Sequence, residues 1–208
     1  SLRHEILGAA SRLFVEEGFQ RVTMRRIAER IEYSPTTIYL HFKDKNELLA
    51  AVCQETFAQL TAKIERIRRS APTPMAYLRE GLRTYVEFGL AHPDQYVVTF
   101  MIPAPTLPDL PPGQAIGQQA FETLRAGVRA CAEHGDIQTS DIEATAQALW
   151  AAVHGVTSLL ISTKGFPFVS QSVLVDHVID TALAGLKTPP SAARAIVAPQ
   201  SKKWNYFD

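Results

Sequence analysis

Apolar residues recur three or four positions apart through most of the chain, and this helical spacing is interrupted at intervals by capping residues, prolines and glycines. The first part of the pattern predicts short helices, and the remainder predicts longer ones. We therefore expect an all-α protein. Its 208 residues allow a small domain together with a larger one.

Two short helices joined by a tight turn are expected early in the chain. Thr23 can cap the first of them, in which Ile27 and Ile31 fall four residues apart on one face. Ser34 can cap the second, and Pro35 then takes its first position, where a missing N–H costs nothing. The two helices are therefore bounded by their own local signals.

The second of these helices has an apolar side and a polar side. Ile38 and Phe42 can pack on the first helix, while Thr36, Thr37, Leu40 and His41 point outward with Tyr39 at the edge. After a break, Asp44 can cap a further, long helix. This order of helix, turn and outward-facing helix is typical of a DNA reader, although the same spacing also occurs at ordinary packing corners of helical proteins.

The local charge favours the first of these two interpretations. Residues 21–45 contain six basic and three acidic residues, in a chain whose formal net charge is +0. A basic patch on a neutral protein indicates a docking face for nucleic acid. Tyr39 and His41 can donate hydrogen bonds to phosphate, and Lys45 adds its charge near the start of the following helix.

The first quarter of the chain closely resembles the DNA-binding domain of the TetR family of bacterial transcriptional regulators. The match begins with an amphipathic helix at Ile6–Phe14. The other matching residues are Glu17-Gly18-Phe19, Thr23, Ile27-Ala28, Thr37-Ile38-Tyr39-Leu40-His41-Phe42, Lys43-Asp44-Lys45 and Glu47-Leu48-Leu49. The chain departs from the family pattern at Glu32, where a turn glycine is common. A residue other than glycine is expected to strain that turn.

The resemblance implies roles for nine residues. The residues that would contact phosphates are Thr23, Tyr39, His41 and Lys45. Those that would face the major groove are Arg25, Pro35, Thr36, Thr37 and Leu40. Thr23 is expected to cap its helix in either case, and the alternative for Pro35 is that it only starts one. Arg26 and Arg30 are expected on a solvated face rather than at the bases.

The rest of the chain predicts six further helices and one irregular segment. The helices are expected at about 46–69, 74–91, 94–101, 114–134, 141–164 and 170–187, with a proline-rich loop at 103–112. Thr73, Ser140 and Ser170 are the expected caps. We expect a helix-turn-helix domain at 1–46, a larger helical effector-binding and dimerisation domain at 47–188, and a C-terminal tail at 189–208.

The expected function of the larger domain comes from the same resemblance, because the second domain of the family binds a small effector and forms the dimer. The segment Trp150–Val156, with its Trp and His-Gly, also resembles the signature of one subgroup of such domains. Independently of the family, Lys164 is the only Lys or Arg between Ser140 and Gly185.

Two helices with so little charge cannot both face water. The segments 140–164 and 170–187 are therefore expected to form a four-helix interface in a two-fold homodimer. The alternative is a single large core within one chain.

A pocket is expected between the two ends of the molecule. Its candidate residues are Tyr85, Phe88, Phe100, Met101, Phe121, Trp150 and His154. Core packing is the alternative for each of them. His154, one turn after Trp150, is either a polar anchor for a ligand or a histidine satisfied by a neighbouring helix, and Gly155 beside it favours the second because it indicates close helix packing.

Other functional classes find little support. There is no glycine-rich phosphate loop, nucleophile elbow or metal-spaced His/Cys cluster, so we expect no enzyme, no cofactor and no metal site. Cys53 and Cys131 are expected to be buried as small apolar residues. With no signal peptide visible and no uninterrupted apolar run of about 18 residues, we expect a cytoplasmic protein without a membrane partner.

The pattern and the resemblance together indicate a ligand-responsive transcriptional regulator. We expect a repressor that binds a palindromic operator as a dimer, with its recognition helices about one helical turn apart, and that a small, largely apolar effector releases. The alternative is a helical protein-interaction scaffold that does not bind DNA. The aromatic end at 202–208 is expected to dock on the body of its own chain or of a partner, or to be ordered only by crystal packing.

Overall fold

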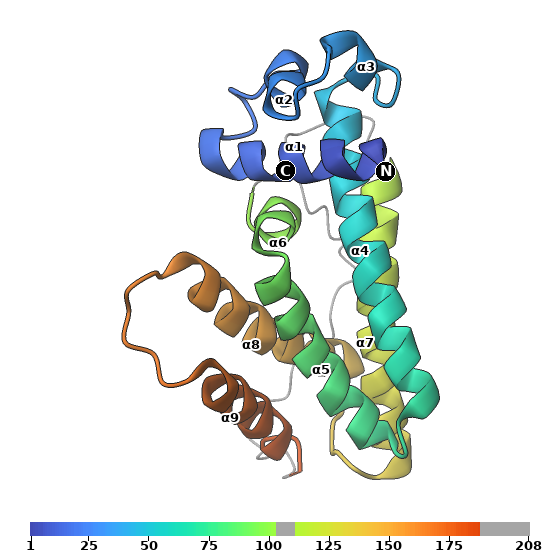
Figure 1. The fold of residues 1–208 in the computed structure, drawn as a ribbon. Helices are drawn as coiled ribbons and strands as arrows, with labels where there is room; N and C mark the ends of the chain where they lie inside the picture. Colours follow the sequence, from blue (N-terminus) through green and yellow to red (C-terminus); the bar gives the residue numbers. More distant parts are fainter. Residues whose placement is uncertain (103–110, 188–208) are drawn as a thin grey trace.

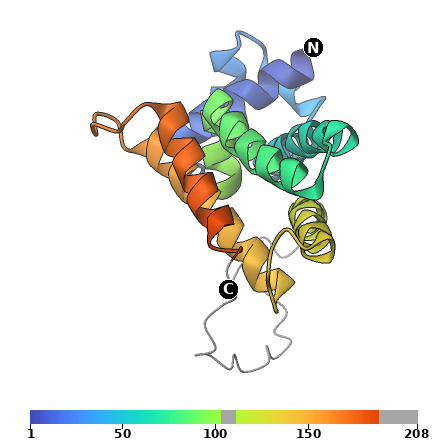
Figure 2. The ribbon, with the colours of Figure 1, turned by 90° about the horizontal axis from the view of Figure 1, so that it is seen from below.

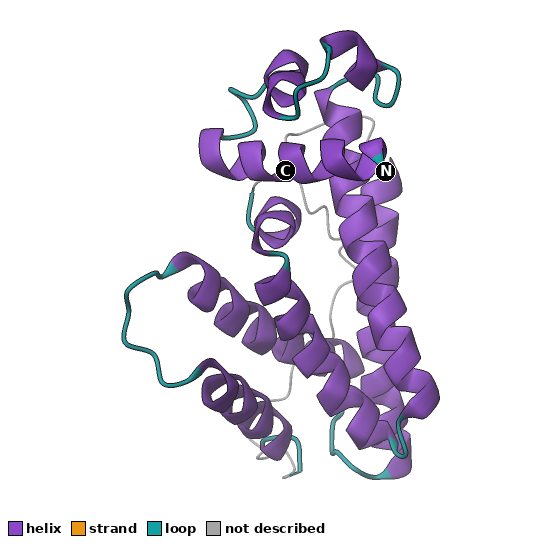
Figure 3. Ribbon diagram, viewed as in Figure 1, coloured by secondary structure: helices purple, strands orange, loops and turns teal. Residues whose placement is uncertain are grey.

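The computed structural model describes residues 1–102 and 111–187, and these residues are helical with no strand (Figures 1 and 3). The aromatic tail therefore lies outside the described residues. The helices are α1 (Leu2–Glu17), α2 (Met24–Arg30), α3 (Pro35–Tyr39), α4 (Lys45–Ser70), α5 (Pro74–Ala91), α6 (Pro93–Phe100), α7 (Pro111–His134), α8 (Ile142–Ser162) and α9 (Gln171–Ala184).

Side-chain caps begin four of these helices where the sequence predicts them. Thr23 accepts a hydrogen bond from the Arg26 N–H at 3.1 Å, and Ser34 accepts one from the Thr37 N–H at 3.2 Å. Asp44 likewise caps α4 and Thr73 caps α5. Because each cap satisfies a backbone donor that the helix leaves free, the starts of α2 to α5 are fixed locally.

Several predicted boundaries are wrong. Helix α7 begins at Pro111 rather than at residue 114, so the last two prolines of the expected loop are helical. Proline is tolerated in a first turn because its missing N–H has no partner there. The cap of α8 is Asp141 rather than Ser140, since the Asp141 carboxylate accepts the Ala144 N–H at 2.9 Å. Ser170 precedes α9 but makes no side-chain cap bond.

The head of the molecule is formed by α1, α2, α3 and the first turns of α4, at the top of Figure 1. Ile27 and Ile38 are fully buried and Phe42 is nearly so, which confirms that α3 packs on α2 through its apolar side. The same buried cluster takes in Val98 from α6. The head is therefore packed against a helix that lies well after it in the sequence.

The body is formed by α4 to α9 around a second buried cluster. Helix α5 packs against α4 and α7 and also against α8 and α9, which lie next to each other (Figure 2). Helix α8 is long and apolar enough to cross a membrane by length and composition alone, with 33% of its most apolar window buried. Buried helices of globular proteins pass the same test, and α8 here packs on α5, α7 and α9.

Helices α5, α6 and α8 approach closely at Gly89. A Cβ atom at this position would lie 2.5 Å from the Thr157 Cγ2 atom and 2.7 Å from the Tyr96 ring. The close packing expected at Gly155 is wrong, because a Cβ added there meets no atom within 4 Å in this chain. Glycine thus allows a close approach on α5 rather than on α8.

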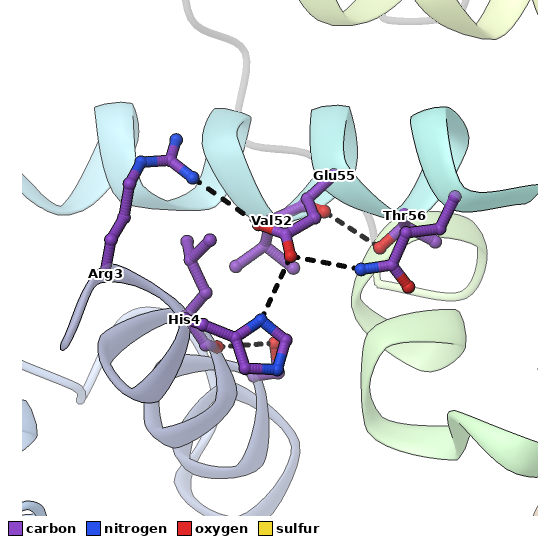
Figure 4. A network of polar contacts seen from close by, with 8 residues as sticks. Arg3, His4, Val52, Glu55 and Thr56 are labelled. Atoms are coloured by element: carbon purple, nitrogen blue, oxygen red, sulfur yellow. Dashed lines mark hydrogen bonds and ion pairs between the residues drawn. The ribbon is translucent and has the colours of Figure 1, made fainter. Parts of the chain in front are cut away.

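A carboxylate on α4 ties the first turn of α1 to the body (Figure 4). Glu55 accepts hydrogen bonds from Arg3 Nη1 at 3.4 Å and from His4 Nδ1 at 3.1 Å, and Gln59 also donates to it at 3.0 Å. The contacts of Arg3 and His4 cross from α1 to α4, so they help to hold the start of α1 against the long helix.

The turn between α2 and α3 contains a strained residue, as the sequence predicts. Glu32 has a φ of 60°, in the left-handed region that glycine adopts without penalty. We expect Glu32→Gly to raise the free energy of unfolding by about 1 kcal/mol. Chemical denaturation measures this, with Ala62→Gly as the control, since Ala62 is exposed within α4 and its change should lower stability by about the same amount. Equal destabilisation by both changes would show that the turn is not strained.

Candidate nucleic-acid interface and effector site

The residues expected to face DNA gather on the outer surface of α2 and α3, at the end of the molecule farthest from α9 (Figure 1). Seven of the nine are exposed: Thr23, Arg25, Pro35, Thr36, Tyr39, Leu40 and His41. Thr37 is half-buried, and its hydroxyl lies 2.9 Å from that of Ser34. The short helix α3 therefore presents one polar face with a single large apolar side chain, Leu40.

Two of the basic residues of the head are neutralised by acids of α1. Arg26 donates to Glu17 at 2.9 and 3.0 Å, and Arg30 donates to Glu16 at 2.7 Å. Arg25 differs, because its only ion pair among the described residues is with Glu29 of the same helix, and its side chain is 80% exposed. Arg25 is therefore the most exposed arginine of α2.

Lys45 has a structural partner as well as a predicted DNA contact. Its Nζ atom donates to the backbone carbonyls of Phe19 at 2.6 Å and Gln20 at 3.2 Å, and it lies 4.4 Å from the centre of the Phe19 ring. Burial lowers the pKa of Lys45. An ammonium group has three N–H donors, so one remains for a phosphate while two hold the loop after α1.

Five of the seven effector-site candidates lie close together in the body. The Trp150 ring lies 5.9 Å from that of His154 and 6.0 Å from that of Phe121, measured between centres. Tyr85 and Phe100 are 5.7 Å apart, and Phe100 is 6.2 Å from His154. Phe88 instead stacks near His92, and Met101 packs at the edge of the same core.

Sequence reasoning missed Tyr96, which joins this group from α6. Its hydroxyl lies 2.6 Å from His154 Nδ1 and 3.0 Å from the Tyr85 hydroxyl. A signal was present, since Tyr96 falls four residues before Phe100 on the same side of a predicted helix. The Tyr96 ring packs against Phe100 at 4.8 Å, so the two residues contact the site together.

The polar groups of this site form one chain of hydrogen bonds. Trp150 Nε1 donates to the Tyr85 hydroxyl at 3.2 Å, and Ser158 Oγ donates to the His154 carbonyl at 2.7 Å. Between these ends, each hydroxyl has one proton to give, and the chain runs in one direction when Tyr85 donates to Tyr96 and Tyr96 donates to His154 Nδ1. The imidazole then carries its proton on Nε2, which lies 3.3 Å from Ser158 Oγ.

In this arrangement His154 is neutral and accepts a hydrogen bond at Nδ1. Burial lowers the pKa of His154 and raises that of Tyr85, so both groups are held uncharged at neutral pH. A second proton, on Nδ1, would make the Tyr96 oxygen the acceptor there, and the Tyr96 proton would lose its acceptor. The structure thus shows a histidine satisfied by a neighbouring helix, and the bond that satisfies it crosses from α6 to α8.

The stability of the protein should depend on pH through this histidine. Because the folded-state pKa is below the unfolded value of about 6.5, the unfolded chain takes up a proton that the folded ring does not. We expect the melting temperature to fall as pH drops from 7 to 5. His154→Asn, which retains an acceptor but cannot be charged, should flatten that fall. His41→Asn, at an exposed position with no ion pair among the described residues, should not. An unchanged slope in His154→Asn would contradict the assignment.

Two cavities lie outside this group. One of about 260 Å³ is lined by Met75, Arg79, Asp180, Leu183, Ala184 and Lys187, and one of about 290 Å³ is lined by residues 17–21 and Ile102. No group of three or more potential metal ligands occurs among the described residues. Cys53 and Cys131 are free and lie on different helices; Cys131 is buried as expected, whereas Cys53 is half-buried.

Comparison with known proteins finds a family match for both parts of the chain. The sequence model of the bacterial regulatory proteins of the TetR family matches residues 6–52, and that of the tetracyclin repressor-like C-terminal domain matches residues 78–183. The HTH-type transcriptional repressor Rv1474c of Mycobacterium tuberculosis is 33% identical over 94 residues, which are 45% of this chain and 43% of the relative. The HTH-type transcriptional activator FasR of Mycolicibacterium smegmatis is 31% identical over 86 residues, 41% of this chain and 39% of the relative.

The chain thus spans less than half the length of these two curated relatives. The fold match is longer: a regulatory protein of the TetR family from Rhodococcus RHA1 superposes with a TM-score of 0.76 over 90% of this chain and 98% of that one, at 21% identity. The two proteins therefore share the same fold. These relatives are transcriptional regulators rather than enzymes, and the second family match alone covers half of the sequence. The chain belongs to the TetR family of bacterial regulatory proteins.

Proposed function

We propose that this protein is a ligand-responsive repressor that binds a palindromic operator as a homodimer. The observation that carries the proposal is the exposed face of α2 and α3, where the residues expected to contact DNA lie together within the part of the chain that matches the family's DNA-binding domain. Repression is preferred because the relative with the higher identity of the two compared is a repressor.

The role of each residue on this face is assigned from the exposure of its side chain and from the hydrogen-bond donors that it has free. Thr23, Tyr39 and His41 contact phosphates, together with the remaining N–H donor of Lys45. The major groove receives Arg25 and the outward side of α3, namely Pro35, Thr36, Thr37 and Leu40. Arg26 and Arg30 instead brace α2 against α1 through their glutamate partners.

The dimer interface is proposed to lie on α8 and α9. Large apolar side chains are exposed there, from 50% for Leu159 to 57% for Val173, and 58–59% for Phe166 and Val169 on the connecting loop. Apolar groups gathered on adjacent helices in this way mark an interaction site. Two copies of α8 and α9 would form a four-helix interface and set two reading faces about one helical turn of DNA apart.

Effector binding is proposed to occur at the aromatic group around His154 and to reach the head through α6. Tyr96 of α6 is fully buried in the body and bonded to His154, whereas Val98, two residues later, is 3% exposed within the core of the head. A small, largely apolar molecule that displaces the Tyr96–His154 contact would therefore also shift Val98. It favours one arrangement of head and body only if its affinity for the two arrangements differs.

The remaining assignments follow from this function. We place the boundary between the DNA-binding and effector domains near residue 46, within the first turn of α4, with a tail from residue 189. We also propose that the Trp150–Val156 segment assigns the effector domain to the Trp/His-Gly subgroup of the family, and that the protein works in the cytoplasm, where its operator lies.

Selection of bound duplexes from a random DNA pool tests the proposed function. The protein should enrich a palindrome whose half-sites are about 10 base pairs apart, centre to centre. The double variant Tyr39→Phe/His41→Ala removes two exposed donors and should bind that operator at least about tenfold more weakly. His134→Ala, at the exposed end of α7, is the control and should bind normally. Absence of any enriched sequence at low salt would favour the protein-interaction scaffold instead.

A further inference from the structure

Leu40 is the most exposed of the large apolar side chains that lie on the surface of the described residues. It is 80% exposed, while the others range from 39% to 59%. A single exposed leucine is ordinary on a protein surface, so exposure alone identifies no function. Its position is the informative part, because Leu40 ends α3 and stands one turn after Thr36, on the side that α3 turns away from its core.

The chemistry of α3 restricts how it can distinguish bases. Residues 34–42 contain no Arg, Lys, Asn or Gln, the residue types that pair through two hydrogen bonds with guanine or adenine. The hydroxyls of Thr36 and Thr37 serve several bases, and the Thr37 hydroxyl already lies within hydrogen-bond distance of Ser34. Polar contacts from α3 therefore cannot select one base pair strongly.

The major groove offers one apolar group on its base edges, the C5-methyl group of thymine. We propose that Leu40 is a specificity-determining residue that selects thymine by packing on this methyl group. The inference rests on the proposed DNA-binding function and deepens it by naming a base. Contact with the methyl group would bury apolar surface that both molecules otherwise expose to water. This burial should strengthen binding by about fourfold per half-site.

Replacement of thymine by deoxyuridine tests this contact, because it removes the C5-methyl group and leaves base pairing intact. The operator selected as above is substituted one thymine at a time, symmetrically in both half-sites, and its affinity is measured by fluorescence anisotropy at one fixed salt concentration. Wild-type protein should show one position per half-site at which deoxyuridine weakens binding by about fourfold per half-site.

The same scan with variants identifies the side chain responsible. In Leu40→Ala the penalty at that position should disappear, and the variant should bind the thymine operator about as weakly as wild type binds the deoxyuridine operator. Leu40→Met keeps an apolar side chain of similar size and should keep the penalty. Val15→Ala truncates a side chain of α1 that is 39% exposed, and it should leave the scan unchanged. Melting temperatures should be the same for all, because none of these side chains is buried.

Three results would overturn the proposal. The first is a deoxyuridine penalty of the same size in wild type and Leu40→Ala at every thymine, which would leave DNA binding itself intact. The second is an enriched operator with no invariant thymine in its half-sites. The third is the absence of any enriched operator, which would remove the proposed function and this inference together.

Discussion

The paired substitution Leu159→Glu/Val173→Glu is expected to convert the proposed dimer into a folded monomer. Both side chains are at least half exposed in the single chain, so the change should not unfold it, but four glutamates would meet in the proposed interface. Each monomer would then reach only one half-site. Operator affinity should fall at least about 100-fold, because the two DNA-binding domains are no longer linked to each other.

Sedimentation and operator affinity measured at the same protein concentration check this expectation. The matched control is Gln54→Glu/Ala62→Glu, which adds the same charge at exposed positions of α4. It should remain dimeric and lose little affinity. A Leu159→Glu/Val173→Glu protein that stays dimeric and binds the operator normally would place the interface elsewhere.

Gly89→Ala is expected to have the largest effect of any single methyl group in the body. The added Cβ would clash with Thr157 and Tyr96, at 2.5 and 2.7 Å, so either α5 and α8 separate or the Tyr96 ring moves. Overpacking of this kind typically costs about 1–3 kcal/mol of unfolding free energy, or about 2–12 °C in melting temperature for a chain of this size. Because Tyr96 also holds His154, the histidine-dependent pH slope should flatten as well.

Gly8→Ala is the control for this change. A Cβ at Gly8 has Arg12 Nη1 as its nearest neighbour at 3.8 Å, an ordinary contact, so alanine should stabilise α1 by up to about 1 kcal/mol. The melting temperatures of the two variants are compared. Their difference separates the effect of the clash at Gly89 from the general effect of replacing a helical glycine by alanine. If Gly89→Ala were as stable as Gly8→Ala, the close approach of α5, α6 and α8 would be contradicted.

The parts of the fold that depend on neighbouring residues could be predicted from the sequence. Thr23, Ser34 and Asp44 each cap the helix that follows, because a cap needs only a short polar side chain and the first turn beside it. The errors at Pro111 and Ser140 are of the same local kind: proline is allowed in a first turn, and Asp141 displaces Ser140 as the nearer cap.

The tertiary arrangement of the site could not be predicted in the same way. A count of charges within residues 21–45 left out Glu16 and Glu17, which lie earlier in the chain and neutralise Arg30 and Arg26. Helical spacing put Trp150 and His154 on one face, but the bond between His154 and Tyr96 joins residues 58 positions apart. Gly155 is a similar case: a glycine in the sequence does not show whether a neighbouring helix packs against it, and none does so here among the described residues of this chain.

The most direct test of the central claim is the number of chains bound per operator, together with the affinity for half an operator. Mass photometry of the protein on the selected duplex should show two chains, and a duplex carrying one half-site should bind at least about 100-fold more weakly. That result would establish a dimer reading two half-sites. One chain per duplex, with equal affinity for the half-operator and the full operator, would contradict the account.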